Sequence, residues 1–280
     1  MAQSLPVLRC RGRVLGLERP VVMGVLNVTP DSFSDGGRFV RLDAAVERGL
    51  QMAEEGAAII DVGGESTRPG AQPVDLHEEL RRVIPVIARL RDRTPAILSV
   101  DTSKPEVMVA AATAGAAMIN DVRALREPGA LEAAETSGCA VCLMHMLGDP
   151  RTMQDAPTYR EVVAEVRYFL EERVGVCFRA GIPAERIVLD PGFGFGKTLA
   201  HNLELLRHLG EVSVRGLPVL AGLSRKSMVG AITGRSADER AQGSVALAVV
   251  AALNGARILR VHDVAATVDA LKVVAAVQNG

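Results

Sequence analysis

The sequence contains no run of apolar residues long enough to cross a membrane. A membrane-spanning helix needs roughly 18 or more consecutive apolar residues, and no stretch of the chain reaches that length. The segment Met1–Pro20 carries arginines but lacks the apolar centre of a signal peptide. We therefore expect a cytoplasmic protein with no membrane partner.

Net charge is almost absent, and lysine is scarce. The formal charge is −1, and only 4 of the 32 basic residues are lysines. A chain without a positive excess is not expected to bind nucleic acid through its phosphates. A local basic pocket for a small anion is compatible with this charge. The scarcity of lysine makes Lys226, which follows an apolar run, a notable residue.

The chain has 4 cysteines, and two of them, Cys139 and Cys142, form a C-x-x-C pair. The pair falls at an apolar run that we interpret as a strand. Residues three apart on a strand point to opposite faces and lie about 10 Å apart. This separation is too large for a disulfide or a shared metal ion. We interpret both cysteines as structural.

Eight short apolar runs alternate with helical patterns along the chain. Runs that are continuously hydrophobic, rather than alternating, are typical of parallel strands buried on both faces. The predicted strands are Val21–Val28, Ala58–Gly63, Ile97–Thr102, Ala117–Val122, Ala140–His145, Ile187–Pro191, Val219–Ser224 and Arg257–His262. The predicted helices are Leu42–Glu55, Leu76–Arg91, Glu106–Ala114, Tyr159–Arg179, Leu199–Leu209, Gly243–Leu253 and Val264–Val277.

This order of elements in 280 residues predicts an α/β fold, a (β/α)8 TIM barrel, with an open doubly wound sheet as the alternative. No linker divides the chain, so we expect one domain over residues 1–280. Within it, residues 1–20 would hold a short N-terminal β-hairpin, and residues 21–280 the barrel. The hairpin, Val7–Leu17 with its turn at Arg11–Gly12–Arg13, is expected to plug the barrel floor.

Each predicted strand ends in polar residues. The carboxyl ends of barrel strands carry the active site in this fold, and an unpaired buried polar group destabilises the folded chain. Eight polar strand ends therefore indicate a pocket for a polar ligand. The ends contain, in chain order, Asn27, Asp61, Asp101, Asn120, His145, Asp190, Lys226 and Arg260.

One part of the predicted pocket suits an anion together with a metal ion. Arg260 and His262 are two residues apart and share one face of the last strand. That strand neighbours the first in a closed barrel, which brings Asn27 alongside, and the second loop adds Thr67 and Arg68. Cationic groups beside an amide oxygen suit diphosphate with Mg2+.

The opposite side of the predicted pocket suits a heterocycle with amino groups. Asp101, Asn120 and Asp190 supply oxygens that accept hydrogen bonds from an N–H/NH2 edge. Lys226 can donate to a carbonyl oxygen. Asp121 should face away from this side, because it follows Asn120 directly on the strand.

Residues 194–198, Gly-Phe-Gly-Lys-Thr, look like the end of a phosphate-binding P-loop. The first glycine of that motif would have to be residue 191, which is Pro191. Proline breaks the required loop geometry, so we do not assign a nucleotide site to Lys197.

Longer segments carry a family resemblance. Met23–Gly37 and Asp61–Gly70 are similar to the two signature segments of dihydropteroate synthases. Further matches run in the right order and spacing to Val264, so the resemblance covers most of the chain. They are Ser99–Thr102, Ile119–Val122, Leu143–Met146, Leu189–Gly192, Ser224–Ser227 and Arg260–Val264.

The resemblance implies an enzyme that condenses 6-hydroxymethyl-7,8-dihydropterin diphosphate with 4-aminobenzoate by an SN1-like course. It also implies a homodimer, Mg2+ as cofactor, and a target of sulfonamides. Asp101, Lys226, Arg260 and His262 would be the catalytic residues. The implied site residues are Asn27 for the metal; Thr67, Arg68, Arg260 and His262 for diphosphate; Asp101, Asn120, Asp190, Phe195 and Lys226 for the pterin; and Phe33, Pro69 and Ser227 for 4-aminobenzoate.

Three alternative functions stay open from the sequence. A pterin-binding methyltransferase acting on a corrinoid protein would keep the Asp/Asn cluster but would not need Arg260 and His262. A non-catalytic paralogue would bind pterin or a partner protein without turnover. A Schiff-base aldolase would need a lysine inside a strand, whereas Lys226 lies just beyond one.

Overall fold

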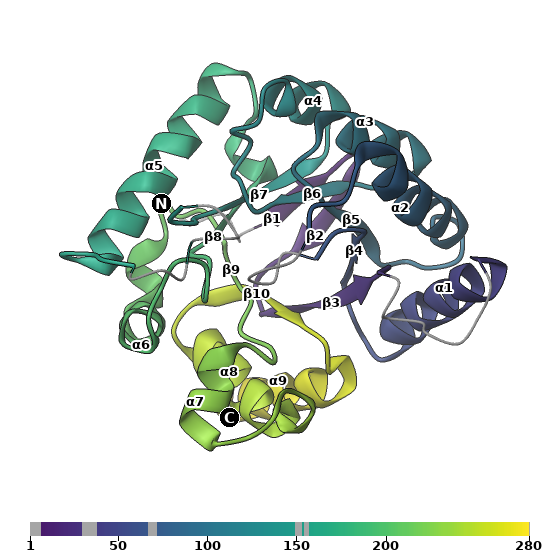
Figure 1. Cartoon of the computed structure of the whole chain (residues 1–280). Coiled ribbons are helices and arrows are strands. Elements are labelled where there is room, and N and C mark those ends of the chain that lie inside the picture. The colour runs from purple at the N-terminus through teal and green to yellow at the C-terminus, as the bar shows by residue number, and fades with distance from the viewer. Residues whose placement is uncertain (1–6, 30–37, 67–71, 149–152, 154–156, 280) are drawn as a thin grey trace.

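The computed structural model describes residues 7–29, 38–66, 72–148, 153 and 157–279. Among these, eight parallel strands form a closed barrel with helices around it (Figure 1). The open-sheet alternative is therefore wrong. In order around the barrel, the strands are β10 (Ala256–Val261), β3 (Val21–Asn27), β4 (Ile59–Gly63), β5 (Ile97–Asp101), β6 (Met118–Asp121), β7 (Ala140–Met144), β8 (Ile187–Asp190) and β9 (Val219–Ala221).

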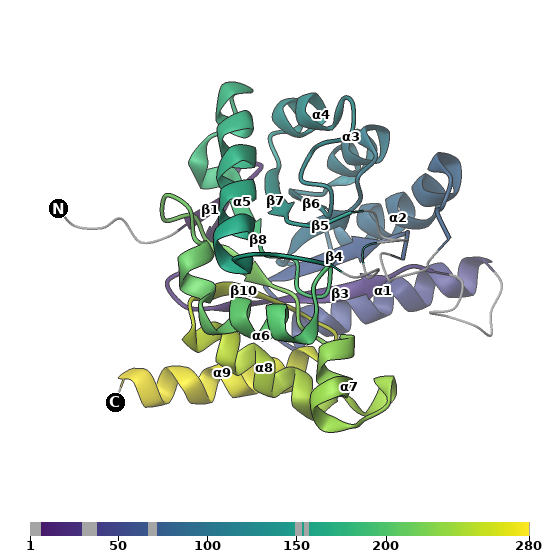
Figure 2. The same ribbon diagram turned by 60° about the vertical axis from the view of Figure 1, so that its left-hand side comes forward.

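Helices lie outside the strands and cover the barrel (Figure 2). Glu78 and Glu79 in the first turn of α2 and the side chain of its N-cap residue Asp75 favour a helix start there. The helices are α1 (Arg38–Glu54), α2 (Leu76–Leu90), α3 (Pro105–Ala114), α4 (Ala130–Ser137), α5 (Val162–Arg179), α6 (Leu199–Arg207), α7 (Ser227–Thr233), α8 (Ala241–Leu253) and α9 (Val264–Asn279), with 3-10 turns η2 (Ala184–Arg186), η3 (Leu209–Val212) and η4 (Ala237–Glu239).

The N-terminal hairpin closes one end of the barrel, as predicted. Strands β1 (Val7–Cys10) and β2 (Arg13–Gly16) pair antiparallel around a turn in which Gly12 has a positive φ of 81°. Leu8 and Cys10 are fully buried and join one apolar cluster with inward side chains from the amino ends of the barrel strands, such as Met23. The barrel floor is therefore sealed by apolar packing.

Above this apolar floor the inward side chains become polar. Strand register places Val25 beside Asp61 and Asp61 beside Ser99, one layer above the floor. The outward side chains of the same strands pack against the helices in a second, larger apolar cluster. The barrel is thus a cup with an apolar base and a polar interior toward its carboxyl rim.

The structure confirms that the C-x-x-C pair is structural. Cys139 belongs to the outer apolar cluster and its thiol donates to the carbonyl of Ala116, 3.4 Å away. Cys142 belongs to the inner cluster. All four cysteines are buried and free. Among the described residues, no helix is long and apolar enough to cross a membrane.

Candidate functional site

The predicted polar strand ends meet inside one buried space. Arg260 on β10 donates from Nε to Oδ2 of Asp61 on β4 and from Nη2 to Oδ2 of Asp101 on β5, each at 2.7 Å. Asn120 on β6 donates from Nδ2 to the same oxygen of Asp61 at 2.9 Å. Residues from four strands therefore form one hydrogen-bonded network.

This network corrects one expectation from the sequence. We placed Arg260 on the diphosphate side and Asp101 on the opposite side, yet the two side chains are bonded directly. The reason is the reach of arginine: its guanidinium extends from β10 past β3 to the carboxylates of β4 and β5. Strand order can be inferred from a sequence, but the direction of a long inward side chain cannot.

Burial sets the protonation behaviour of the network. It raises the pKa of Asp101 to about 7, and Arg260 opposes this shift only in part. The pKa of Arg260 lies above its usual value, because the attraction of Asp61 and Asp101 outweighs the cost of burying its charge. The neighbouring carboxylate of Asp61 adds to the rise in the pKa of Asp101, because two like charges repel.

Lys226 and Asp190 interact electrostatically with each other and with Arg260. The ammonium of Lys226 donates to the carbonyl of Phe193 and lies 4.6 Å from the centre of the Phe195 ring. Burial lowers the pKa of Lys226 to about 8, and the charge of Asp190 limits that shift. Asp190 is buried, which raises its pKa, and its Oδ1 accepts a hydrogen bond from the amide of Gly192 at 2.7 Å.

The turn after β9, which carries Lys226, is held in place by hydrogen bonds from two arginines. Arg225, with a positive φ of 57°, forms a two-point ion pair with Asp263, at 3.1 and 2.5 Å. Arg240 donates to the carbonyls of Arg225 and Lys226. This bracing fixes Lys226 and presents Ser227, the exposed first residue of α7, at the rim.

Asn27 and His262 stand at the carboxyl ends of the adjacent strands β3 and β10. His262 is oriented by the Ser224 hydroxyl, 3.0 Å from its Nδ1. A Cβ built on Gly63 would lie 3.8 Å from Oδ1 of Asn27 and 3.8 Å from Oδ2 of Asp101. The amide oxygen of Asn27 therefore faces the same small space as the Asp101 carboxylate.

Four predicted site residues lie outside the described part of the chain. They are Phe33 in the first loop and Thr67, Arg68 and Pro69 in the second. Every other predicted site residue lies at the carboxyl end of the barrel.

Sequence reasoning gave no role to four residues that lie in or beside this space, although Asp61 was among the polar strand ends that it named. Asp61 is fully buried in the network. It lies two residues before Gly63 at the end of the strand, so the alternation of side chains along a strand predicts that it points into the barrel. Met144 and Met146 form a small buried cluster against Phe195, which gives the pocket an apolar side. Lys197 was set aside with the P-loop pattern, although only 3% of it is exposed.

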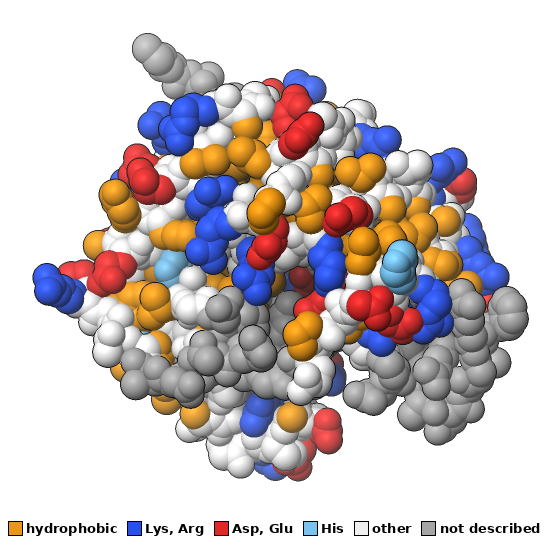
Figure 3. All heavy atoms as spheres, turned by 45° about the horizontal axis from the view of Figure 1, so that its top comes forward, with side chains coloured by type: hydrophobic (Ala, Val, Ile, Leu, Met, Phe, Trp, Pro, Cys, Tyr) orange, Lys and Arg blue, Asp and Glu red, His pale blue; other side chains and the backbone are white. Residues whose placement is uncertain are grey.

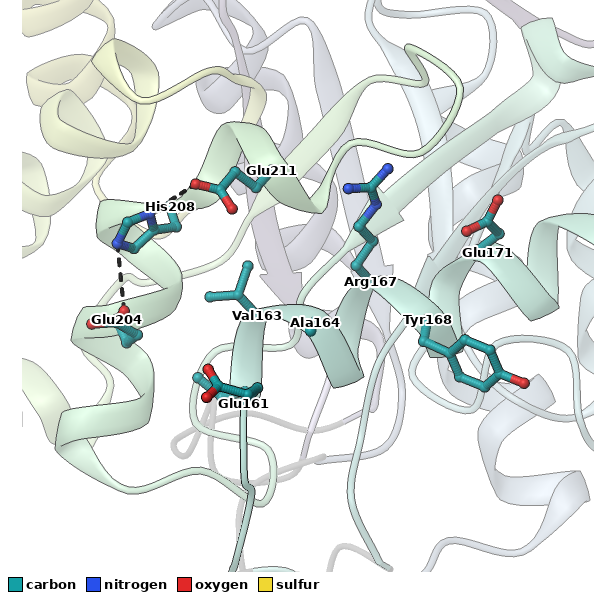
Figure 4. A pocket seen from close by; sticks show the side chains of 10 residues that line it. Glu161, Val163, Ala164, Arg167, Tyr168, Glu171, Glu204, His208 and Glu211 are labelled. Carbon is teal, nitrogen blue, oxygen red and sulfur yellow. Dashed lines mark hydrogen bonds and ion pairs between the residues drawn. The ribbon is translucent and has the colours of Figure 1, made fainter.

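A cavity of about 420 Å³ lies elsewhere, among the helices (Figure 4). It lies between the first half of α5 and the α6–η3 segment, and none of the predicted site residues lines it. His208 is already paired there with Glu204 and Glu211, at 3.4 and 2.9 Å. In the described residues, no group of three or more His, Cys, Asp or Glu residues could hold a metal ion.

The surface over the view in Figure 3 mixes both signs of charge. Lys and Arg side chains are interspersed with Asp and Glu on this face and do not gather in one patch. This mixture of signs agrees with the small net charge of the chain.

Comparison with known proteins gives matches along nearly the whole chain. The family model described as "Pterin binding enzyme" matches residues 23–262. The dihydropteroate synthase of Escherichia coli (strain K12) is 55% identical over 266 residues, which cover 95% of this chain and 94% of that protein.

Solved structures give the same result. A Xanthomonas albilineans dihydropteroate synthase with 4-aminobenzoic acid aligns with a TM-score of 0.93 and 59% identity, covering 98% of this chain and 99% of the other. A Yersinia pestis dihydropteroate synthase with a sulfonamide drug aligns with a TM-score of 0.93 and 52% identity, covering 98% and 100%.

Proposed function

Because the chain belongs to the pterin-binding enzymes, among the dihydropteroate synthases, we propose that its barrel rim joins a pterin diphosphate to 4-aminobenzoate. The products are 7,8-dihydropteroate and diphosphate. The observation that carries the proposal is the buried network of Arg260 with Asp61 and Asp101, closed by Asn120. The comparisons favour this reaction over the corrinoid methyltransferase and the aldolase.

The pterin is held, in this proposal, by Asp101, Asn120, Asp190 and Lys226. Carboxylate and amide oxygens accept hydrogen bonds from the N–H and NH2 groups of the ring edge, and Lys226 donates to its carbonyl oxygen. The Phe195 ring and the methionine cluster give the ring an apolar surface. These contacts orient the CH2 group that carries diphosphate toward the open rim.

The diphosphate is held by His262, Arg260, Thr67 and Arg68. Arg260 donates two of its five N–H groups to Asp61 and Asp101, so three donors remain for a phosphate oxygen. Because it also bonds Asp101, Arg260 connects the diphosphate side of the pocket to the pterin side.

Asn27 fits a magnesium ion. Mg2+ is commonly bound by one or two protein oxygens together with substrate phosphates and water, and the Asn27 amide oxygen faces the Asp101 carboxylate across Gly63. Bound there, the ion would neutralise charge on the diphosphate.

The bond to diphosphate breaks first, and the pterin ring spreads the positive charge left on carbon. The neutral amine of 4-aminobenzoate then attacks this carbon and loses a proton. The residues of the pocket hold and orient the reactants and exclude water, so the main contribution is electrostatic preorganisation. Ser227 would receive the carboxylate of 4-aminobenzoate, with Phe33 and Pro69 shaping its pocket.

We further propose a cytoplasmic homodimer. Large apolar side chains are exposed on neighbouring helices α7, α8 and α9, among them Ile232, Leu253 and Val277. Helices α8 and α9 lie side by side (Figure 2). The free, buried thiols are compatible with a reducing compartment.

The test is an assay with 6-hydroxymethyl-7,8-dihydropterin diphosphate, 4-aminobenzoate and Mg2+, in which released diphosphate and dihydropteroate are both quantified. We expect one diphosphate per dihydropteroate formed. Arg9→Ala, at an exposed position on the hairpin at the opposite end of the barrel, is the matched control and should turn over like the parent chain. Folded protein that forms no dihydropteroate under these conditions would refute the proposed function.

A further inference from the structure

The segment between β8 and α6 is fixed by hydrogen bonds from several directions. The Tyr159 hydroxyl donates to the carbonyl of Gly196 at 2.9 Å. The amide of Gly194 donates to Oδ1 of Asn202 at 2.7 Å. This segment carries Phe195, and it begins directly after Asp190. Its conformation therefore determines how two of the proposed pterin contacts are presented.

Lys197 lies near the end of this segment, and its side chain turns back to bind the segment itself. Its Nζ is 2.9 Å from the carbonyl oxygen of Gly192, 3.0 Å from that of Phe195 and 2.9 Å from Nδ1 of His145. An ammonium has three N–H groups, and these three partners use all of them. The charge is thus held by carbonyl dipoles and an imidazole, although burial is costly for it and lowers the pKa of Lys197 to about 7.

His145 is a fixed and neutral partner. Burial and the nearby Lys197 charge lower its pKa to about 2, so the ring is uncharged and Nδ1 can accept the hydrogen bond. Its ring packs edge-on against Phe169, with centroids 5.0 Å apart, and its backbone amide donates to the carbonyl of Asp190 at 2.9 Å. Lys197 therefore joins the segment to a rigid point just beyond β7.

The two carbonyls that Lys197 binds belong to residues that touch the proposed pterin site with other atoms. Gly192 donates its amide to the Asp190 carboxylate, and Phe195 places its ring 4.6 Å from the Lys226 ammonium. A Cβ on Gly192 would lie 1.9 Å from the carbonyl oxygen of His145, so the backbone passes directly against the end of β7. Loss of the Lys197 bonds would release both contacts together.

We propose that Lys197 is a positioning residue for pterin binding, because its ammonium ties the segment after β8 to His145 and so fixes Asp190 and the Phe195 ring. The inference rests on the proposed function, since it assigns the pterin to Asp190, Phe195 and Lys226. Lys197 acts through these residues and does not touch the substrate, because its donors are used within the protein.

The test compares Lys197→Met, which keeps the length and apolar stem of the side chain, with the parent chain and with the exposed control Arg9→Met. The loss of several hydrogen bonds from one buried charge should raise KM for the pterin diphosphate by about ten- to a hundredfold. KM for 4-aminobenzoate, measured at saturating pterin diphosphate, should change less than about twofold, since its contacts lie on other loops. Calorimetry with 6-hydroxymethyl-7,8-dihydropterin, which lacks diphosphate, should show the same loss of affinity.

A second variant covers the case in which Lys197→Met does not fold. Lys197→Gln retains two N–H donors and should recover part of the pterin affinity. The inference is wrong if a folded Lys197→Met or Lys197→Gln variant binds the pterin like the parent chain, or if both substrates weaken equally. Failure of the parent chain to bind the pterin at all would instead overturn the proposed function.

Discussion

The guanidinium of Arg260 lies 2.7 Å from the carboxylate of Asp61, although 199 residues separate them in the chain. Asp61 is fully buried, whereas Arg260 is partly exposed toward the pocket. The carboxylate therefore works as the fixed point and the guanidinium as the group presented to a ligand. The same oxygen of Asp61 also accepts from Asn120, so one carboxylate orients two proposed substrate contacts.

Asp61→Asn should lower both stability and activity. The substitution removes one of the two carboxylates that pair with Arg260 and brings an amide NH2 group against the donors of Arg260 and Asn120, so we expect a loss of about 1–3 kcal/mol in the free energy of unfolding. Urea denaturation measures this loss. We also expect kcat/KM for the pterin diphosphate to fall at least about tenfold. A variant with unchanged stability and activity would show that Asp61 does not support Arg260.

Asp190→Ala should remove pterin binding without unfolding the barrel. The lost carboxylate accepts charge-assisted hydrogen bonds from the ring edge, so affinity for 6-hydroxymethyl-7,8-dihydropterin should fall at least about tenfold. Calorimetry gives the affinity, and circular dichroism checks the fold. Normal affinity in a folded variant would overturn the assignment of Asp190 to the pterin pocket.

Arg260→Ala should affect the two forms of the pterin differently. The diphosphate substrate loses a cation that contacts its anion, whereas the free pterin alcohol loses only the support given to Asp101 and Asn120. We expect the larger loss of affinity for the diphosphate form, by about tenfold or more relative to the alcohol. Titration of both ligands against the same variant makes the comparison, and equal losses would contradict a diphosphate contact.

Acid should destabilise the chain through His145. Its pKa is about 2 in the folded state against an ordinary value of 6.5, so between these values the unfolded chain binds more protons. The contribution of His145 to the free energy of unfolding therefore falls as pH drops below 6.5, by about 1.5 kcal/mol on reaching pH 5, whereas the raised pKa of Asp101 acts in the opposite direction. His145→Asn keeps an acceptor near the Nδ1 position and should lose this component. Denaturation curves at several pH values test the difference, and identical slopes for the two proteins would rule it out.

Lys104→Met should destabilise the barrel. Lys104 bridges the carboxylates of Glu65 and Glu79, and Glu79 on α2 is almost completely buried. Truncation leaves a buried carboxylate without its cation, at a cost of about 2–4 kcal/mol. The double variant Lys104→Met with Glu79→Gln should recover part of this loss. Arg9→Met, on an exposed ion pair with Glu185, should change the free energy of unfolding by less than about 0.5 kcal/mol.

Most of the fold could be predicted because a parallel barrel leaves a simple pattern. Strand β4 was predicted as Ala58–Gly63 and is Ile59–Gly63, because buried parallel strands read as short, continuous apolar runs. Helix α4 was missed because it has only eight residues and begins after Gly129, without a side-chain cap. The polar residues at the strand ends could be predicted because each stands at the end of a recognisable apolar run.

Side-chain direction was the part that the sequence could not supply. Asp101 and Arg260 were placed on separate sides of the pocket, yet they form an ion pair at 2.7 Å. Lys197 gave a misleading signal, since the only pattern around it was that of a phosphate loop. One of its partners, His145, is 52 residues away in the chain and is brought near only by the packing of β7 against β8.

The hairpin formed by β1 and β2 leaves the barrel interior open only at the carboxyl ends of the strands. Leu8 and Cys10 close the amino end of the barrel. Both reactants would therefore enter, and both products leave, at the carboxyl end. The reactant that lies deeper in the barrel cannot leave while the second reactant is bound above it. In the proposed reaction the two reactants would therefore bind one after the other, with the pterin nearer the barrel floor than 4-aminobenzoate.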